Sequence, residues 1–465
     1  MCSNSSPSRE EAPRRTSIGP RAGSSPPPST QELPVGVDRK GKERTVRTKK
    51  VLATAALIAT GALLTGCSGG PTGDDGEVTI TYGVWAGTQT PAMEAIAAAF
   101  EEENPGINVE VQEQPWPQYW STLQTGAQGG TAPDAFWMLA QQIRPYAAGG
   151  QLLDITDAVE SEGVDLANYP QAVLDLYDQG DGAIYGLPKD FDTNGVWFNK
   201  ELFDAAGVDY PSPDWTWDDF RETARALTTD DVWGIAAPID PQGGYYNTIY
   251  QAGGQVISDD GTTATIDSPE AVEGIKFWTD LQADGSSPTL QQLSDTEAVT
   301  MFEQGKVAMY MSGSFWALQF YNNEEFRPKV DVAPLPTGPA GQANITSGIA
   351  NVGFAGTDHP EEVTKFLLFA SGERAAQIQA ETGAVLPAFE GTQQGWIDAM
   401  PEFENLQVFI DAVDYAVPLP VQGNAAQWQG LQTEYLTPAW NGETSAEEAA
   451  EQYAAAIDEV LAADR

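Results

Sequence analysis

Residues 77–111 read EVTITYGVWAGTQTPAMEAIAAAFEEENPGINVEV, and this stretch decides the fold. Residues 77–84 alternate β-branched or aromatic residues with others, which predicts a strand. Thr90 and Pro91 then provide a helix N-cap and a proline at the first helical position, and an Asn-Pro-Gly turn ends the helix. Residues 107–111 alternate again. A strand, a helix and a second strand in this order predict a parallel sheet covered by helices.

The loop after the first predicted strand comprises residues 85–89, WAGTQ. In open α/β sheets, ligands bind outside the carboxyl ends of the strands. We therefore expect Trp85 and Gln89, at the two ends of this loop, to lie at a binding site.

Upstream of this body, residues 46–67 read VRTKKVLATAALIATGALLTGC. Three cations precede an apolar run over residues 51–64, and small residues then lead to Cys67, which is the layout of a secretory signal. The apolar run is shorter than the ~20 residues that a membrane-spanning helix needs. The Leu-Thr-Gly-Cys ending resembles the lipobox of bacterial lipoproteins. We therefore interpret residues 46–66 as a lipoprotein signal peptide and Cys67 as the lipidated residue; the alternative is an ordinary signal peptide with a coincidental cysteine.

Two polar segments flank this signal. Residues 1–45 are rich in Ser, Pro and Arg and lack an apolar period, which predicts a disordered leader. Such a leader is either a genuine extension or lies upstream of a true translation start at Val46. Residues 67–75 are small and polar, and we interpret them as a flexible tether between the anchor and the body.

The charge of the chain is uneven. Of the 23 Lys and Arg residues, 11 precede Cys67, and of the 67 Asp and Glu residues, 5 do, which leaves 12 cations against 62 acids after the signal. Such an acidic body repels nucleic acid and anionic lipid surfaces, so we expect no nucleic-acid partner. It also disfavours an anionic ligand, although a solubilising surface alone would explain most of the charge.

Several kinds of active site lack their residues here. Cys2 is the only other cysteine and His359 the only histidine, so neither a disulfide framework nor a zinc site with several His or Cys ligands is expected. No GxxxxGK[ST] phosphate-binding loop, GxSxG nucleophile elbow or HExxH zinc helix occurs in the chain. We expect no metal and no cofactor.

Six segments, in one order, carry a resemblance to a known family. They are residues 92–111 (AMEAIAAAFEEENPGINVEV), 133–137 (PDAFW), 185–192 with 197–200 (YGLPKDFD and WFNK), 214–220 (DWTWDDF), 305–309 with 312–316 (GKVAM and SGSFW), and 359–373 (HPEEVTKFLLFASGE). Together they resemble the extracellular solute-binding lipoproteins of carbohydrate ABC importers, the maltose-binding protein class. The resemblance covers nearly all of residues 77–465.

This resemblance implies an α/β fold of the two-lobed, periplasmic-binding-protein type. Each lobe would be a helix-covered, mostly parallel sheet, and hinge strands would join the lobes around an enclosed ligand. Lobe one would comprise residues 76–191 and 345–400, and lobe two residues 196–340 and 401–465.

The resemblance also implies a function. The protein would be a receptor and not an enzyme, a monomer anchored through Cys67 on the extracellular face of the cell membrane. It would capture a sugar, a neutral mono- or oligosaccharide, and deliver it to the permease subunits of an ABC importer. Two alternatives remain open: a secreted glycoside hydrolase lipoprotein, which needs two carboxylates flanking the scissile bond, and the same receptor fold binding a polyamine or another cation.

Sugars present a face of C–H groups and a rim of hydroxyls, which aromatic rings and side-chain amides or carboxylates contact. We selected rings and polar groups in predicted loops, and positions that match the family. The predicted ligand contacts are Trp85, Gln89, Trp116, Trp137, Gln141, Asp192, Gln242, Tyr245, Tyr246, Asn247, Phe315, Trp316, Gly348 and Trp428.

Some of these predictions carry a particular reason. Phe315 and Trp316 compete for one ring position, and Gly348 would let the second crossing strand approach the ligand closely. Trp428 resembles the ring that closes the family's pocket from the second lobe. Four further tryptophans are expected to be structural: Trp215, Trp217, Trp278 and Trp440.

Overall fold

The structure, a computed structural model, describes residues 77–463. The leader, the signal peptide, the lipidation site at Cys67 and the tether all lie outside the described residues. The chain divides into two units, Met1–Gly70 and Pro71–Arg465, and every described residue belongs to the second unit. No helix within residues 77–463 is long and apolar enough to cross a membrane.

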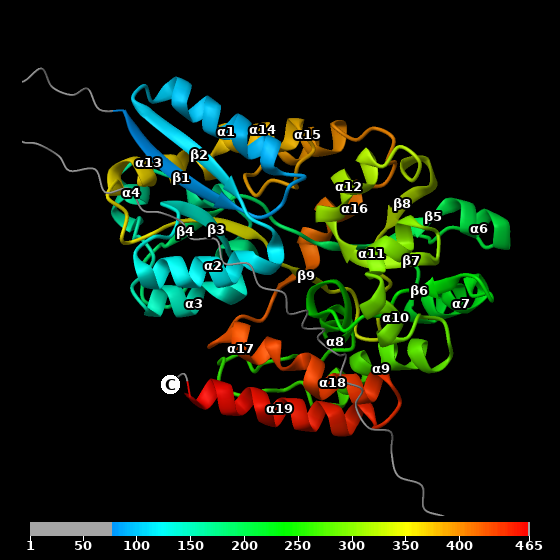
Figure 1. The fold of residues 1–465 in the computed structure, drawn as a ribbon. Coiled ribbons are helices and arrows are strands. Elements are labelled where there is room, and N and C mark those ends of the chain that lie inside the picture. Colours follow the sequence, from blue (N-terminus) through cyan, green and yellow to red (C-terminus); the bar gives the residue numbers. More distant parts are fainter. Residues whose placement is uncertain (1–76, 464–465) are drawn as a thin grey trace, which may run out of the picture. The chain divides into compact units, whose positions relative to one another are not determined.

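Two sheets organise the described residues (Figure 1). The first has the strand order β2–β1–β3–β10–β4, the second has the order β6–β7–β5–β8, and β11 and β9 form a two-stranded ribbon. We call the parts built around the first and second sheets lobe one and lobe two. The strands are β1 (Val78–Val84), β2 (Ile107–Glu113), β3 (Ala135–Leu139), β4 (Gly186–Pro188), β5 (Asn194–Asn199), β6 (Trp233–Ile235), β7 (Val307–Gly313), β8 (Val330–Ala333), β9 (Asn344–Thr346), β10 (Ile349–Gly353) and β11 (Ala416–Pro418).

Helices cover both sheets. In lobe one they are α1 (Thr90–Glu103), α2 (Trp116–Gly129), α3 (Ala140–Ala148), α4 (Thr156–Ser161), α5 (Gln171–Leu174), α13 (Pro360–Ser371) and α14 (Glu373–Glu381). The remaining helices within residues 77–463 are α6 (Lys200–Ala206), α7 (Trp217–Leu227), α8 (Tyr246–Gln251), α9 (Pro269–Ala283), α10 (Leu290–Asp295), α11 (Ala298–Glu303), α12 (Ala317–Asn322), α15 (Gln393–Asp398), α16 (Gln407–Asp411), α17 (Ala425–Gly430), α18 (Gln432–Trp440) and α19 (Ala446–Ala463). Of these, α15 packs against α14 of lobe one. Short helical turns are η1 (Leu166–Asn168), η2 (Pro241–Tyr245), η3 (Ser314–Trp316), η4 (Arg327–Lys329) and η5 (Ala412–Tyr415).

The opening strand, helix and strand form as predicted. β1 and β2 pair in parallel from Val78 opposite Ile107 onwards, and α1 connects them. The face of α1 that carries Met93, Ile96 and Phe100 is buried against this sheet, together with residues of α13 (Figure 1). This apolar stripe at helical spacing is what holds the helix on the sheet.

The cap of α1 differs from the prediction. Gln89 occupies the N-cap position, and Thr90 is the first helical residue. The Thr90 hydroxyl donates to a carboxylate oxygen of Glu113 at 2.7 Å instead of accepting from the helix. A charged acceptor at the end of β2 makes the stronger hydrogen bond, and it draws the hydroxyl away from the backbone.

The predicted two-lobed α/β fold is confirmed, with one reversed strand in each sheet. β10 is antiparallel to β3 and β4, and β5 is antiparallel to β7 and β8. Both reversed strands follow a crossing between the sheets, at residues 189–193 and 347–348. Because they start at the edge where the other strands end, they must run the opposite way. The remaining lobe boundaries stay a prediction.

The end of the chain returns to lobe two. α18 and α19 pack against α9, and Figure 1 shows these helices side by side. Trp215, Trp217, Trp278 and Trp440 are all buried within lobe two, which confirms their predicted structural role.

Candidate ligand-binding site at the crossing between the lobes

The register of both sheets brings the carboxyl ends of their strands to the two crossings. In lobe one, Leu139 at the end of β3 lies opposite Ile349 at the start of β10. In lobe two, Gly313 at the end of β7 lies opposite Asn194 at the start of β5. The loops that follow β1, β3 and β7 therefore open on the edge where the chain passes between the lobes, which is where ligands bind in such folds.

The two crossing segments pair with each other. The Asp192 N–H donates to the Ser347 carbonyl at 2.8 Å, and the Ser347 N–H returns a bond to the Asp192 carbonyl at 3.2 Å. A Cβ atom at Gly348 would lie 2.5 Å from the carbonyl oxygen of Asp190. Glycine is therefore required here for the approach of one crossing strand to the other, whereas the sequence had suggested an approach to the ligand.

The first crossing buries three charged side chains. Lys189 and Asp190 form an ion pair, and the second carboxylate oxygen of Asp190 accepts from the Ile349 N–H at 2.7 Å. Asp192, the predicted acidic contact, accepts from the Ser314 hydroxyl at 2.8 Å. Burial, followed by the charge of Asp190, raises the pKa of Asp192 to about 7. Burial likewise raises the pKa of Asp190, and the Lys189 ammonium opposes this rise.

Five aromatic rings gather on the lobe-one side of this edge. Trp85, in the loop after β1, packs against four rings at centroid distances from 4.8 to 5.7 Å: Trp116, Tyr119, Trp120 and Trp137. Trp116 is 48% exposed, whereas Trp137 is fully buried in β3 and donates its indole N–H to the Tyr82 hydroxyl. The structure thus brings together three predicted rings, of which Trp85 and Trp116 can reach a ligand directly and Trp137 supports them from beneath.

The lobe-two side contributes the turn η3 after β7. Trp316 is half-buried, donates its indole N–H to the Ser312 hydroxyl at 3.1 Å and stacks on Phe320. Phe315 lies beside it, with 5.5 Å between the ring centroids. Both rings therefore stay candidates for contact, next to the Ser314 hydroxyl that meets Asp192.

Three predicted amides differ in how they are engaged. The Gln89 Oε1 atom accepts from the Lys189 ammonium at 3.1 Å. The Gln141 Oε1 atom, at the start of α3, is buried without a hydrogen-bond partner among residues 77–463. Gln242 in η2 is half-buried, and its main-chain carbonyl accepts from Asn247 at 2.7 Å. An unpaired buried acceptor is costly, so Gln141 is the amide most ready for a ligand hydroxyl.

Three other predicted contacts are wholly buried. The Asn247 amide donates to the Gln242 and Gly244 carbonyls and accepts from the Ile345 N–H, so its bonding capacity is used within lobe two. Tyr245 donates to Gln432, and the Tyr246 ring packs edge-on against it. This geometry favours a scaffolding role for Asn247 and Tyr245, whereas the Tyr246 hydroxyl is buried without a hydrogen-bond partner among residues 77–463.

Trp428 is also fully buried, and its indole N–H donates to the Gln422 carbonyl at 3.0 Å. Its helix, α17, packs against α19 of lobe two and against α3 of lobe one. α17 therefore lies where the two lobes meet, and Trp428 belongs to the buried core rather than to an open surface.

Sequence reasoning missed Lys189, Asp190 and Ser314. All three stand in quoted motifs, YGLPKDFD and SGSFW, directly after strands that are buried throughout. A lysine next to an aspartate at the end of a buried segment is the signal that could have identified the pair, because lysine is almost never buried unless it is paired.

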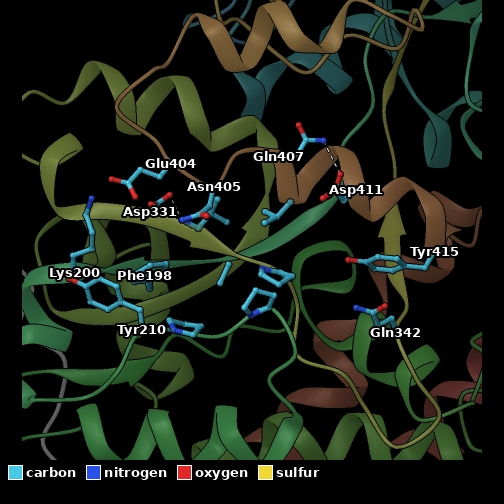
Figure 2. A pocket seen from close by; sticks show the side chains of 16 residues that line it. Phe198, Lys200, Tyr210, Asp331, Gln342, Glu404, Asn405, Gln407, Asp411 and Tyr415 are labelled. Atoms are coloured by element: carbon cyan, nitrogen blue, oxygen red, sulfur yellow. Dashed lines mark hydrogen bonds between the residues drawn. The ribbon is translucent and has the colours of Figure 1, made fainter.

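A separate groove of about 570 Å³ follows β8, the edge strand of the second sheet (Figure 2). None of the fourteen predicted contacts lines it. Its buried acid, Asp331, already accepts from the Val332 N–H at 2.9 Å and from the Asn405 amide at 3.0 Å. These bonds cap the open edge of the sheet, and we do not assign the ligand to this groove.

Comparison with known proteins agrees with the geometry. A maltodextrin-binding protein of Bacillus subtilis is 25% identical over 82% of this chain and 90% of that protein. A lipoprotein of Streptomyces antibioticus is 26% identical over 70% of this chain and 72% of the relative. The ABC substrate-binding protein of Listeria monocytogenes, solved in complex with cycloalternan, is 28% identical with a TM-score of 0.76, over 83% of this chain and 99% of that one.

Within residues 77–463, no group of three or more His, Cys, Asp or Glu side chains is arranged to hold a metal ion. The rings, the amides and the Asp192 carboxylate at the crossing are suited to holding a solute between two lobes. The sequence model of one family matches residues 86–377, which is more than half of the chain. This protein belongs to the bacterial extracellular solute-binding proteins.

Proposed function

We propose that this protein is a receptor that captures a neutral sugar between its lobes and delivers it to the permease of an ABC importer. The observation that carries the proposal is the set of groups at the crossing: exposed tryptophan, an unpaired amide oxygen and one carboxylate. One relative is named a maltodextrin-binding protein, and another was solved in complex with cycloalternan.

Each group has a matching part on a sugar. Trp85 and Trp116 offer ring faces to C–H groups, and such contacts bury apolar area worth ~25 cal/mol per Å². The Gln141 oxygen and the Asp192 carboxylate accept from hydroxyls, and a charged acceptor makes the stronger bond. We take these four side chains, with Phe315 and Trp316 from lobe two, as the proposed contacts.

A thermal-shift screen across mono- and oligosaccharides tests this function. A ligand at 100 times its dissociation constant adds ~2.7 kcal/mol to the free energy of unfolding, which gives a clear shift. Raised melting with the sugar recovered intact supports a receptor. Released product would instead support the glycoside hydrolase, and stabilisation by polyamines alone would support the cation receptor.

We expect neutral sugars to bind about tenfold or more tightly than their phosphorylated forms. Only 12 Lys and Arg residues stand against 62 acids after the signal, so a phosphate gains no attraction on approach and loses its hydration. Calorimetry with matched neutral and phosphorylated sugars measures the difference in affinity. Added salt should reduce this difference, because it screens the long-range repulsion between the acidic protein and the phosphate. Tighter binding of the phosphorylated form would contradict the proposed site.

The lipid anchor is part of the proposal. A relative of similar length is named a lipoprotein, which supports a diacylglycerol-modified Cys67 on the extracellular face of the membrane. Such an anchor would keep the receptor close to its permease, at a raised effective concentration.

Replacing Cys67 by alanine should release the protein into the medium or leave it unprocessed. A fatty-acid analogue should label the wild type and not Cys67→Ala, because the chain has only one other cysteine. Cys2→Ala is the matched control and should keep the label. Label retained by Cys67→Ala would rule out this anchor.

A further inference from the structure

We propose that Lys189 is a positioning residue that holds the lobe-one half of the ligand site in its binding geometry without touching the ligand. The proposal rests on the proposed function in one respect, because it takes the loop after β1 to supply ligand contacts. It concerns a buried cation that the sugar chemistry itself does not require.

The Lys189 ammonium is enclosed by protein groups. The side chain is 1% exposed. Its nitrogen forms an ion pair with Asp190, donates to the Gln89 Oε1 atom at 3.1 Å and lies 4.2 Å from the centroid of the Trp137 ring. A lysine ammonium has three N–H donors, and each has a neighbour here. None is left to bind a hydroxyl of the ligand.

Lys189 and two of these neighbours, Trp137 and Gln89, belong to three different segments. Lys189 follows β4, Trp137 lies in β3, and Gln89 caps α1 after β1. In the sheet, β10 and β3 separate β4 from β1. A single side chain therefore ties the first crossing to a loop that belongs to a strand three positions away.

The Trp137 ring passes this constraint to the aromatic cluster. The Lys189 ammonium lies over the face of the Trp137 ring, and the Trp137 indole N–H donates to the Tyr82 hydroxyl at 2.6 Å. Trp85 packs edge-on against the same ring, with 4.9 Å between the centroids. The main-chain carbonyl of Gln89 also accepts from the N–H groups of Ala92 and Met93 in the first turn of α1. Trp85 and α1 are thus ordered during folding and not on ligand capture, which strengthens binding.

If the Lys189–Asp190 pair were purely structural, removing it would change only the stability of the protein. Removing one charge, and then both, separates this structural role from the positioning role. Lys189→Met leaves the buried Asp190 carboxylate without its cation and should lower the melting temperature strongly. Lys189→Met combined with Asp190→Asn removes both charges, and the asparagine oxygen can still accept from the Ile349 N–H. We expect this double variant to melt close to the wild type.

The double variant should nevertheless lose the positioning. Its near-ultraviolet circular dichroism should weaken, because the Trp137 and Trp85 rings are no longer held. Amide hydrogen exchange at Ala92 and Met93 should accelerate about tenfold or more, since local opening is easier. With maltotriose as the probe, the affinity should fall about tenfold or more.

The exposed pair Lys329–Glu201 on lobe two, at 3.3 Å, gives the matched control. Lys329→Met with Glu201→Gln should change neither spectrum, nor exchange, nor affinity. A folded double variant at the crossing with wild-type spectrum and exchange would overturn the inference, whether or not a sugar binds. If the wild type binds maltotriose, an unchanged affinity in the double variant at the crossing would overturn the inference as well. A wild type that binds no sugar of the panel counts against the proposed function, while the spectrum and the exchange still decide the role of Lys189.

Discussion

Asp192→Asn should weaken sugar binding about tenfold to a hundredfold while making the ligand-free protein more stable above pH 7. The carboxylate accepts from Ser314 and has a second oxygen for a ligand hydroxyl. Hydrogen bonds to charged groups are worth ~1.5–3 kcal/mol, more than those to a neutral amide. Titration calorimetry at pH 8 measures the loss of affinity.

The change in stability follows from the raised pKa of Asp192, about 7 in the folded protein against an ordinary 3.8. A raised pKa means that the folded state favours the protonated form. Below pH 4 this group contributes up to about 4 kcal/mol to the free energy of unfolding. That contribution is lost as the pH rises through 7. Asparagine stays neutral, so urea denaturation should show little difference between the variant and the wild type at pH 4 and a clear gain at pH 8.

Asp331→Asn is the control for this prediction. Asp331 is also a buried acid with a raised pKa, caused first by burial, but it lies in the groove along β8. Its replacement should leave the sugar affinity unchanged. If Asp192→Asn binds sugar as tightly as the wild type, the carboxylate does not contact the ligand. The wild-type affinity should also fall as the pH drops below 7, because the protonated carboxyl is a weaker acceptor.

Trp428→Ala should lower both the stability and the affinity of the protein. From the sequence we expected Trp428 to be the ring that closes the ligand pocket from the second lobe. Its full burial changes that expectation, and loss of a buried tryptophan costs ~3–5 kcal/mol of unfolding free energy. Because α17 also packs against α3 of lobe one, loss of the ring should disturb the contact between the lobes and lower the affinity as well.

Trp278→Ala separates the two effects. Trp278 lies in α9, is 1% exposed and donates to the Thr248 hydroxyl. It is therefore about as buried as Trp428, but its helix packs against α8, α18 and α19. It should lose a similar amount of stability and keep its affinity in the folded molecules. Chemical denaturation and calorimetry, both performed well below the melting temperatures, give the paired values. Equal affinities for the two variants would place Trp428 in the core alone.

The sequence by itself determined the local elements and their order. The alternation in residues 77–84 and the apolar spacing in residues 90–103 became β1 and α1 nearly residue for residue. At the start of α7, Thr216 and Asp219 form a capping box within the quoted segment DWTWDDF. These features depend on neighbours within four positions along the chain, so a pattern of period 2 or 3.6 contains the information. The edge at which we propose the ligand site followed from the same order of elements.

The tertiary structure alone decided which side chains face that edge. Asn247 was predicted in contact with the ligand, but it bonds to Ile345, 98 positions away, and Asp192 meets Ser314 across 122 positions. Trp137 and Trp116 passed the same sequence filter, yet one is fully buried and the other 48% exposed. Lys189 reaches Gln89 across 100 positions. Burial and pairing of this kind arise when distant segments pack, and the residues next to a side chain in the sequence do not record which segment will cover it.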